Sequence, residues 1–586
     1  MSASSRPISD GGVRKERTRL IVIVIYFLLT VLVWGLFALD RGPWQDEVMV
    51  LHNVQARSDS LMGQLFTGIP TSTRVLGGTV FAIGLWTGAP VLVLQLAYGF
   101  SLFATGWLVY LLVRELFPER PWLSYVAGAM ALAFSGDFTL NYLGTTSLAL
   151  SVCAYLAALV LLIRYSQGAH GANLAASCAL LLLGLGMYEA ALPAILLTPL
   201  WLAALERFRT KRALVAGALC YGLTALYLCF LVVEAGRTGG YMTVALRTLS
   251  LGDRWDRTWM LFWNNFTPWT WASGRQNWLP PPPPLLPLPI KLVPTLLAVA
   301  AFWWAAVRIW RRRPEPSPLT PEERYRAVVV GVGALVMALA SNAIYASVQW
   351  SEYFFRTQLV SSRWASLAVA LVSYVVGVAR LRSPLLASIV PAAFVGFGVY
   401  GGLERQDYFL GYWRLHREEL RSIVEELRPL RPESRVLLYV PAGSPYLATE
   451  ATYLARSWLS YLYGEPSLAR RVFLWSPDRR TSCAAEEEAF RCRGESGGGA
   501  PAEESILPYR STVLLRFRPG ENRYALESAV PRRLAGGRRT PDYRPEWQFI
   551  DGDIPDYVRR LLYGREYLAA LLPPARAAPL SPAPRE

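Results

Sequence analysis

Long apolar runs limit the fold of this chain more than any other feature of its sequence. They recur from residue 20 to residue 402. Many of them reach the length of about 20 residues that an α-helix needs to cross the roughly 30 Å apolar layer of a bilayer. The 586-residue chain is 53% apolar and only 17% charged, which excludes a disordered chain and does not fit a soluble globular protein. The sequence therefore predicts a polytopic α-helical membrane protein.

Eleven of these runs are expected to cross the membrane. The predicted spans are 20–39, 90–113, 121–135, 145–163, 172–187, 190–205, 213–233, 291–310, 327–348, 364–380 and 384–402. The run 75–88 is shorter, and its 14 residues would form a helix of only about 21 Å. We expect it to lie at the interface or to form a re-entrant segment.

Basic residues predict the orientation of the spans. Only three of the 59 lysine and arginine residues are lysines, so the net charge of +16 is an arginine charge. In a membrane protein such an excess is typical of cytoplasmic loops, and we expect no nucleic-acid partner. Basic clusters before the first span and at 207–212, 308–326 and 380–382 predict a cytoplasmic N-terminus in the plasma (inner) membrane. The outer loops are then 40–89, 136–144, 235–290 and 349–363, with everything after 403 also outside.

Two parts are expected: a membrane body over 1–403 and an extracytoplasmic domain over 404–586, with a disordered end after about 573. The runs 435–440 and 511–517 are rich in β-branched and aromatic residues and predict strands. Helical spacing at 418–427 and 447–463 then favours a soluble α/β or α+β domain, with a flexible loop at 494–505. Its two cysteines, Cys483 and Cys492, form either a disulfide or two free thiols.

The outer loop 235–290 is rich in aromatic residues between 255 and 278. Tryptophan concentrates at the headgroup level because its ring is apolar and its N–H needs a polar partner. We expect 253–266 to form a helix in the interface. It is either a plain aromatic belt or a segment that overhangs a lipid-borne substrate.

Charged residues at predicted outer helix ends are the candidates for chemistry. Asp46 and Glu47 follow the first span, where one carboxylate could accept a proton while the other orients a partner; alternatively both are solvated loop charges. Asp137 lies in the next outer segment. Arg356 and Arg363 lie where a later span re-enters the bilayer, as phosphate ligands or as snorkelling anchors.

Three further residues are accessory candidates. Glu189 falls between two apolar runs, at a predicted outer turn. His52 could join a metal site, although a lone histidine in a loop is more often not a ligand. Tyr353 belongs to the same segment as Arg356.

With these residues in view, the sequence resembles the GT-C class of integral-membrane glycosyltransferases, which includes protein O-mannosyltransferases and lipid A aminoarabinose transferases. The resemblance rests on the basic N-terminus, the first span and PWQDEVMVLHNV at 43–54, which is similar to the Asp-Glu motif of the family's first outer loop. It extends through YLLVRELF at 110–117, MYEAALP at 187–193 and YFFRTQLVSSRW at 353–364. Where some relatives have His-Pro-Pro or Lys-Pro-Pro, this chain has IPTSTR at 69–74.

The resemblance implies an inverting glycosyltransferase of cell-envelope glycan biosynthesis. Its donor would be a polyprenyl-phosphate-linked sugar, and its acceptor a glycan, a lipid or a protein at the extracytoplasmic face. Asp46 would be the catalytic base, supported by Glu47, with Asp137 as a second acidic site. Arg356 or Arg363 would hold the donor phosphate. A divalent metal ion is the only cofactor that we keep as a candidate.

Two other classes of function fit parts of the pattern. A transporter or flippase of lipid-linked glycan intermediates would carry charges near the bilayer midplane on broken helices. A scaffold of envelope glycan assembly would use the C-terminal domain for binding and the membrane body as an anchor, for which eleven spans are many.

Overall fold

The structure is a computed structural model in which the chain forms two compact units. The first comprises residues 1–41 and 57–411, and the second 42–56 and 412–586. The residues that the structure describes are 10–43, 45–57, 74–137, 142–238, 250–272, 282–312, 319–346, 358–381, 383–442, 444, 452–477, 482–494, 503–531, 534, 540 and 542–563.

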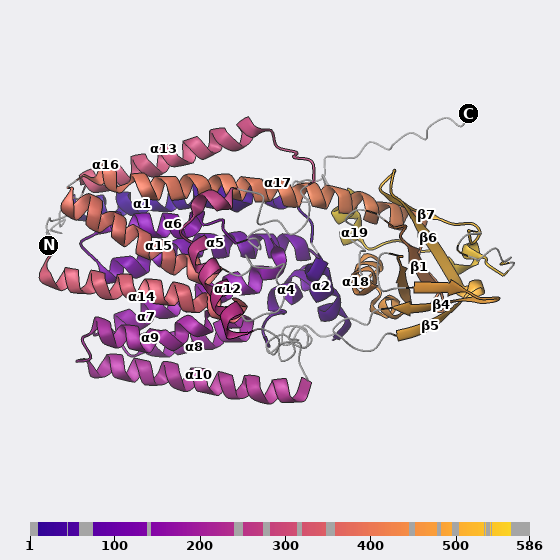
Figure 1. Cartoon of the computed structure of the whole chain (residues 1–586), viewed down its shortest axis with the longest axis horizontal. Coiled ribbons are helices and arrows are strands. Elements are labelled where there is room, and N and C mark those ends of the chain that lie inside the picture. Colours follow the sequence, from indigo (N-terminus) through magenta and orange to yellow (C-terminus); the bar gives the residue numbers. More distant parts are fainter. Residues whose placement is uncertain are drawn as a thin grey trace, which may run out of the picture. The chain divides into compact units, whose positions relative to one another are not determined.

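The first unit is a bundle of helices, most of which run side by side along one direction (Figure 1). Its helices are α1 (Asp10–Thr30), α4 (Thr79–Trp86), α5 (Pro90–Leu116), α6 (Pro121–Ala133), α7 (Thr146–Ser166), α8 (Ala172–Met187), α9 (Leu192–Leu205), α10 (Lys211–Thr238), α12 (Leu251–Asn264), α13 (Leu288–Arg312), α14 (Pro321–Ala346), α15 (Leu359–Ser373), α16 (Pro384–Ala387) and the start of α17 (Ile389–Glu426).

Within the described residues, eight helices are long and apolar enough to cross a membrane, or nine if the bent pair α8–α9 counts as one span. An integral membrane protein is confirmed, but the number eleven is not reached. The three shortfalls are α6, with 13 residues, and α8 and α9, with 16 and 14 residues, which meet at a bend of 116°. The break between α8 and α9 lies at Tyr188, whose backbone is extended, and in the short turn that follows it. The length of an apolar run shows only that the chain avoids water and does not reveal such a break.

Contacts gather the predicted cytoplasmic loops at one end of the membrane unit. The Arg120 guanidinium forms an ion pair of 2.9 Å with Glu323, which joins the start of α6 to the start of α14. Arg164 at the end of α7 pairs with Glu115 near the end of α5 at 2.7 Å. The Tyr325 hydroxyl donates to the carbonyl of Ala204 at 2.7 Å. These loops therefore share one end, as the charge pattern requires; which side of the membrane they face stays a prediction.

Helix α4 covers part of the run 75–88. It has eight residues, about 12 Å of helix, and is too short to cross a bilayer. The segment before it is fixed to the α8–α9 turn and to α7, because Leu76 N–H donates to Gly186 O at 2.8 Å and the Ser147 hydroxyl donates to Gly77 O at 2.7 Å.

The second unit contains an α/β domain, as expected. Its main sheet has the order β2-β1-β6-β7, in which β1 (Arg435–Tyr439) lies parallel to β2 (Val472–Trp475) and β6 (Thr512–Arg518). Strand β7 (Arg523–Leu526) pairs antiparallel with β6, and α18 (Thr452–Tyr463) connects β1 to β2. The predicted strands at 435–440 and 511–517 are confirmed as β1 and β6.

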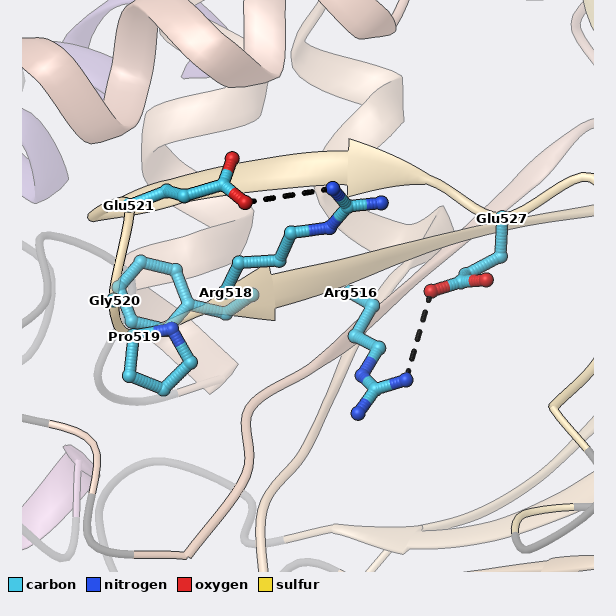
Figure 2. A pocket seen from close by; sticks show the side chains of 7 residues that line it. Arg516, Arg518, Pro519, Gly520, Glu521 and Glu527 are labelled. Atoms are coloured by element: carbon cyan, nitrogen blue, oxygen red, sulfur yellow. Dashed lines mark ion pairs between the residues drawn. The ribbon is translucent and has the colours of Figure 1, made fainter.

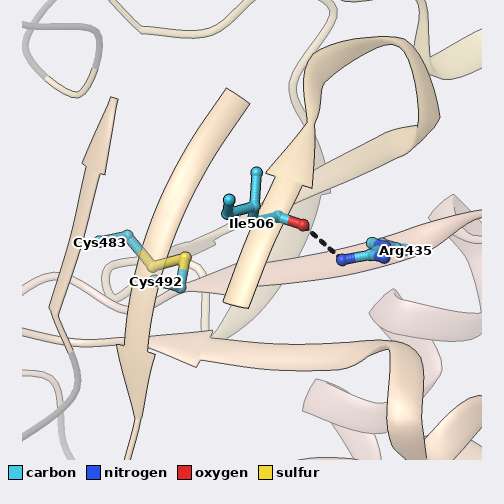
Figure 3. Close-up of a disulfide and its surroundings, with 4 residues drawn as sticks. All are labelled: Arg435, Cys483, Cys492 and Ile506. Atoms are coloured by element: carbon cyan, nitrogen blue, oxygen red, sulfur yellow. Dashed lines mark hydrogen bonds between the residues drawn. A yellow bond between two sulfur atoms is a disulfide. The ribbon is translucent and has the colours of Figure 1, made fainter. Parts of the chain in front are cut away.

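A second, antiparallel sheet comprises β3 (Ser482–Ala485), β4 (Ala489–Gly494) and β5 (Glu503–Pro508). Cys483 and Cys492 lie opposite each other on β3 and β4 and form a disulfide with an S–S distance of 2.06 Å (Figure 3). The Arg435 side chain of β1 donates to the carbonyl of Ile506 on β5, which links the two sheets (Figure 3). The expected flexible loop at 494–505 lies mostly outside the described residues, as does the tail after 573.

Two helices differ from the sequence prediction. The last predicted span, 384–402, and the predicted helix 418–427 belong largely to one helix, α17, of 38 residues. The glycines of α17 do not interrupt the helix and instead allow close packing. A Cβ at Gly398 or Gly402 would come within 3 Å of backbone atoms of Ala133 or Val33. The predicted loop around Asp46 is also wrong, since Gln45–Arg57 forms helix α2.

Candidate functional site

The candidate site is a buried charge cluster in the membrane unit, centred on Asp137. This residue is fully buried in the short segment that follows α6. Gly136 precedes it, and a Cβ there would come within 2.7 Å of Trp271 Nε1 and of the Phe134 ring. The segment can therefore turn beneath Trp271 only with glycine at this position.

Two arginines from different helices reach the last turn of α6 and the segment that follows it. Arg363 of α15 donates to the carbonyl of Ala131, and Arg405 Nε of α17 donates to the carbonyl of Ser135 at 2.7 Å. Both side chains are buried, and both lie within electrostatic range of Asp137 and of the buried Tyr98. A third guanidinium, that of Arg41, lies within electrostatic range of Tyr98 and donates to the carbonyl of Trp34 at 2.8 Å.

The cluster contains more guanidinium groups than carboxylates. The guanidinium groups of Arg363 and Arg405 interact with the Asp137 carboxylate, and that of Arg41 interacts with Tyr98. Burying cations costs free energy unless anions or hydrogen-bond acceptors compensate them. The cluster is therefore suited to an anion, and the planar guanidinium fork matches the oxygens of a phosphate.

The depth of the cluster follows from helix lengths. Asp137 lies one α6 length, about 20 Å, from Arg120 at the basic end. Arg405 lies 16 residues, about 24 Å, from the start of α17. The cluster thus occupies the end of the membrane unit opposite the basic loops.

The structure brings together two of the site residues predicted from sequence, Asp137 and Arg363. It adds Tyr98, Arg41 and Arg405, which sequence reasoning did not select. Arg405 lies three residues beyond the predicted end of the last span. A charged residue so close to a span end was the signal that could have identified it.

The acidic pair lies in the first turn of α2, in the second unit. The Glu47 side chain is buried, and the Asp46 side chain lies outside the part of the chain that the structure describes. Arg356 and Tyr353 also lie outside the described residues. That Asp46 and Glu47 meet the Asp137 cluster therefore stays a prediction.

The two other accessory candidates have defined surroundings. Glu189 lies at the α8–α9 turn, as expected, and Arg74 binds both of its carboxylate oxygens, at 2.6 and 2.9 Å. Arg74 also lies over the Tyr188 ring, 3.6 Å from its centroid. His52 is half-buried on α2, and burial lowers its pKa from the ordinary value. Glu189 therefore holds a segment in place, while the burial of His52 favours its neutral form.

A metal site is not evident in the described ranges. There, no group of three or more His, Cys, Asp or Glu side chains is placed to hold a metal ion.

Two hollows lie in the C-terminal domain. The first, of about 460 Å³, adjoins the β6–β7 turn, where Arg518 pairs with Glu521 at 3.6 Å and Arg516 with Glu527 at 3.9 Å (Figure 2). The second, of about 580 Å³, is lined by residues near the end of α17 and by Tyr563 of α19 (Asp556–Tyr563). Both are open to solvent and carry arginine and carboxylate groups, which suits polar molecules.

Fold and site together define a polytopic helical membrane protein with an arginine-rich buried cluster at one end of its spans. No protein-family model and no curated protein matches the sequence. Among solved structures, the chain is similar to ArnT from Cupriavidus metallidurans bound to undecaprenyl phosphate, with 13% identity and a TM-score of 0.36. The match covers 80% of this chain and 86% of that one. A similarity of this size carries no conclusion about activity.

Proposed function

We propose that this protein is an inverting membrane glycosyltransferase of the GT-C class. It would transfer a sugar from a polyprenyl-phosphate-linked donor to an acceptor at the extracytoplasmic face of the plasma membrane. The observation that carries the proposal is the buried cluster in which Arg363 and Arg405 lie beside Asp137. A donor of this class has a phosphate at the membrane surface and a lipid chain that can lie between helices.

The proposed reaction is a single displacement. The Asp46 carboxylate takes the proton of an acceptor hydroxyl, whose oxygen attacks the anomeric carbon of the sugar. The bond between that carbon and the phosphate oxygen breaks, and the polyprenyl phosphate leaves with the electron pair. Arg363 and Arg405, with Arg356 as a further candidate, balance the negative charge that develops on it. The proposal requires that the first turn of α2 face the Asp137 cluster.

The disulfide supports an extracytoplasmic C-terminal domain. Disulfides persist in oxidising compartments and are rare in the cytoplasm. A bond between Cys483 and Cys492 agrees with the orientation that the arginine clusters predict. The hollows of this domain are then candidate surfaces for a glycan, lipid or protein acceptor.

The bent helix pair α8–α9 is compatible with a second function, that of a transporter or flippase for lipid-linked intermediates. Broken helices are a common feature of transporters. Here, however, the charge at the break, Glu189, is paired with Arg74, which leaves no free charge at this turn for a substrate.

The test is complementation of a deletion strain, with mass spectrometry of its surface glycans and lipids. The proposal predicts that deletion removes a glycosyl group, and that Asp46→Asn fails to restore it although the protein reaches the membrane in normal amounts. Asp40→Asn, which changes an exposed carboxylate six residues earlier, is the matched control and should restore the product fully. Full activity of Asp46→Asn would remove Asp46 from the mechanism. If the deletion strain instead accumulates a lipid-linked sugar on the cytoplasmic side of the membrane, while its extracts still transfer the sugar, the flippase is favoured.

A further inference from the structure

We propose that α12 binds the lipid headgroup layer through Trp255, Trp259 and Trp263, and that Asn264 at its end is a positioning residue for the Asp137 segment and for α15. The positioning role rests on the proposed function. The lipid contact does not, and it can be tested without any activity.

The outward face of α12 exposes three tryptophans, which no described residue of the chain buries. Trp255, Trp259 and Trp263 are 57%, 42% and 48% exposed. Their rings are neighbours, with centroids 6.1 Å apart for the first pair and 5.5 Å for the second. A helix on a soluble surface would turn such residues inward. Here they form a continuous exposed row along one side.

The opposite side of α12 carries the polar contacts with the protein. Asn264 follows Trp259 by five residues, which places it about 140° away around the helix axis. Its side chain is buried, with 4% exposed. The helix therefore buries Asn264, together with Leu261 and Phe262, against the protein and keeps its indole rings away from it.

The occupant of the exposed face is a lipid surface. Helix α12 packs against α14, a membrane-spanning helix, and runs across the direction of the spans (Figure 1). Tryptophan is the residue enriched where headgroups meet acyl chains. The charges of α12 balance, with Asp253 and Asp256 against Arg254 and Arg257, so we expect insertion of aromatic area and not attraction to anionic lipids.

Asn264 connects this helix to two parts of the site. Its amide nitrogen donates to the carbonyl of Gly136 at 3.1 Å and to Gln358 Oε1 at 2.7 Å. The carbonyl of Gly136 adjoins Asp137. Gln358 in turn donates to the carbonyl of Leu261 at 3.1 Å, so the amide pair joins the two chain segments in both directions.

Gln358 links Asn264 to α15. It is the N-cap residue of α15, and its carbonyl accepts from Ser362 N–H at 2.9 Å, one residue before Arg363. A second contact, from the Ser361 hydroxyl to Asn265 Oδ1 at 3.3 Å, holds the same turn. The depth of α12 in the headgroup layer thus sets the positions of both Asp137 and Arg363.

Residue 264 needs both a donor and an acceptor. Its oxygen accepts from the Thr270 hydroxyl at 3.1 Å, while its nitrogen makes the two bonds described above. Asn264→Asp keeps the shape and the acceptor but loses both donors. Because a misplacement of about 1 Å can cost about 10²-fold in rate, the variant should lower kcat by about that factor. The donor KM should rise as well, because a displaced Arg363 holds the donor phosphate less well.

The lipid contact is tested in nanodiscs of phosphatidylcholine brominated near the headgroup end of its chains. The wild-type protein should lose more tryptophan fluorescence than a Trp255→Phe/Trp259→Phe/Trp263→Phe variant, and the difference should be the same at low and high salt. Equal quenching of both proteins would overturn the lipid contact. Quenching that disappears at high salt, or only appears with anionic lipid, would overturn its apolar basis.

The positioning role is tested with Asn264→Asp against Asn342→Asp. Asn342 is a buried asparagine of α14 whose amide donates within its own helix, to Ala338 O at 3.0 Å. We expect faster hydrogen exchange at 134–137, a lower kcat and a higher donor KM for Asn264→Asp only. If both variants only lower Tm, and neither changes exchange at 134–137 or kcat, then Asn264 is merely structural and its positioning role is overturned. If the wild-type chain transfers no sugar, the proposed function fails, while the exchange result still decides whether Asn264 holds the Asp137 segment.

Discussion

Arg405 Nε donates a hydrogen bond of 2.7 Å to the carbonyl of Ser135, two residues before Asp137. Arg363 donates in the same way to the carbonyl of Ala131, near the end of α6. Two guanidinium groups from α17 and α15 are thus fixed by main-chain oxygens of the segment that carries the buried carboxylate. This arrangement fixes where positive charge lies before any ligand binds.

Arg363→Gln and Arg405→Gln should each weaken binding of the donor. A hydrogen bond to a charged group contributes about 1.5–3 kcal/mol, so we expect the dissociation constant for a polyprenyl phosphate to rise by about 10- to 100-fold. The measurement is titration of the purified protein in nanodiscs. The control is Arg380→Gln, which changes an exposed arginine that follows α15. This variant should bind the donor normally. Unchanged binding in both site variants would separate the cluster from the donor phosphate.

The pair Arg74–Glu189 should prove structural. Arg74→Gln alone leaves the Glu189 carboxylate largely buried without its partner and should lower the free energy of unfolding by about 3 kcal/mol. The double variant Arg74→Gln/Glu189→Gln removes the stranded charge and should recover part of that loss. Thermal unfolding of the four proteins gives the coupling. Additive losses would mean that the two residues do not depend on each other.

Burial of His52 should make the protein sensitive to acid. Because burial lowers the pKa of His52 in the folded state, the unfolded chain binds a proton more readily below the ordinary pKa of about 6.5. Stability is therefore full above pH 6.5 and falls as the pH drops towards the folded pKa. We expect Tm to fall more between pH 7.5 and 5.5 in the wild type than in His52→Asn. Parallel curves would show that His52 is not responsible.

The elements that sequence predicted well are those fixed by local pattern. Apolar length predicted the long spans, aromatic and β-branched runs predicted β1 and β6, and the aromatic-rich composition of 255–278 predicted a helix close to the observed bounds of α12. For Cys483 and Cys492 the sequence left a disulfide and two free thiols open, and the structure shows the disulfide.

The features that sequence missed depend on tertiary packing. The length of α17 could not be predicted from its glycines, because their role is to let α17 approach the backbone of α6 and of the residues that follow α1. Helix α2 replaces the predicted loop, and its buried residues Val48, Leu51 and Val54 recur at helical spacing. Arg405 was overlooked because a charge beyond the end of an apolar run looks like solvent-exposed chain until another helix covers it.

The disulfide gives a test of orientation in the full chain. The chain has six cysteines, and four of them are free. Protein denatured without reductant should therefore react with four equivalents of a maleimide, and with six after reduction. Six before reduction, in protein isolated from its native membrane, would argue for a C-terminal domain in the cytoplasm. Cys483→Ser/Cys492→Ser should react with four under both conditions and lose about 3 kcal/mol of stability in this domain.

The most direct test of the whole account is a cryo-electron microscopy structure of the full chain in nanodiscs with a polyprenyl phosphate bound. We expect the phosphate within hydrogen-bond distance of Arg363 or Arg405, with the Asp46 carboxylate facing the same cavity on the side from which an acceptor enters. A phosphate bound elsewhere, or Asp46 turned away from the arginines, would contradict the proposed transfer mechanism.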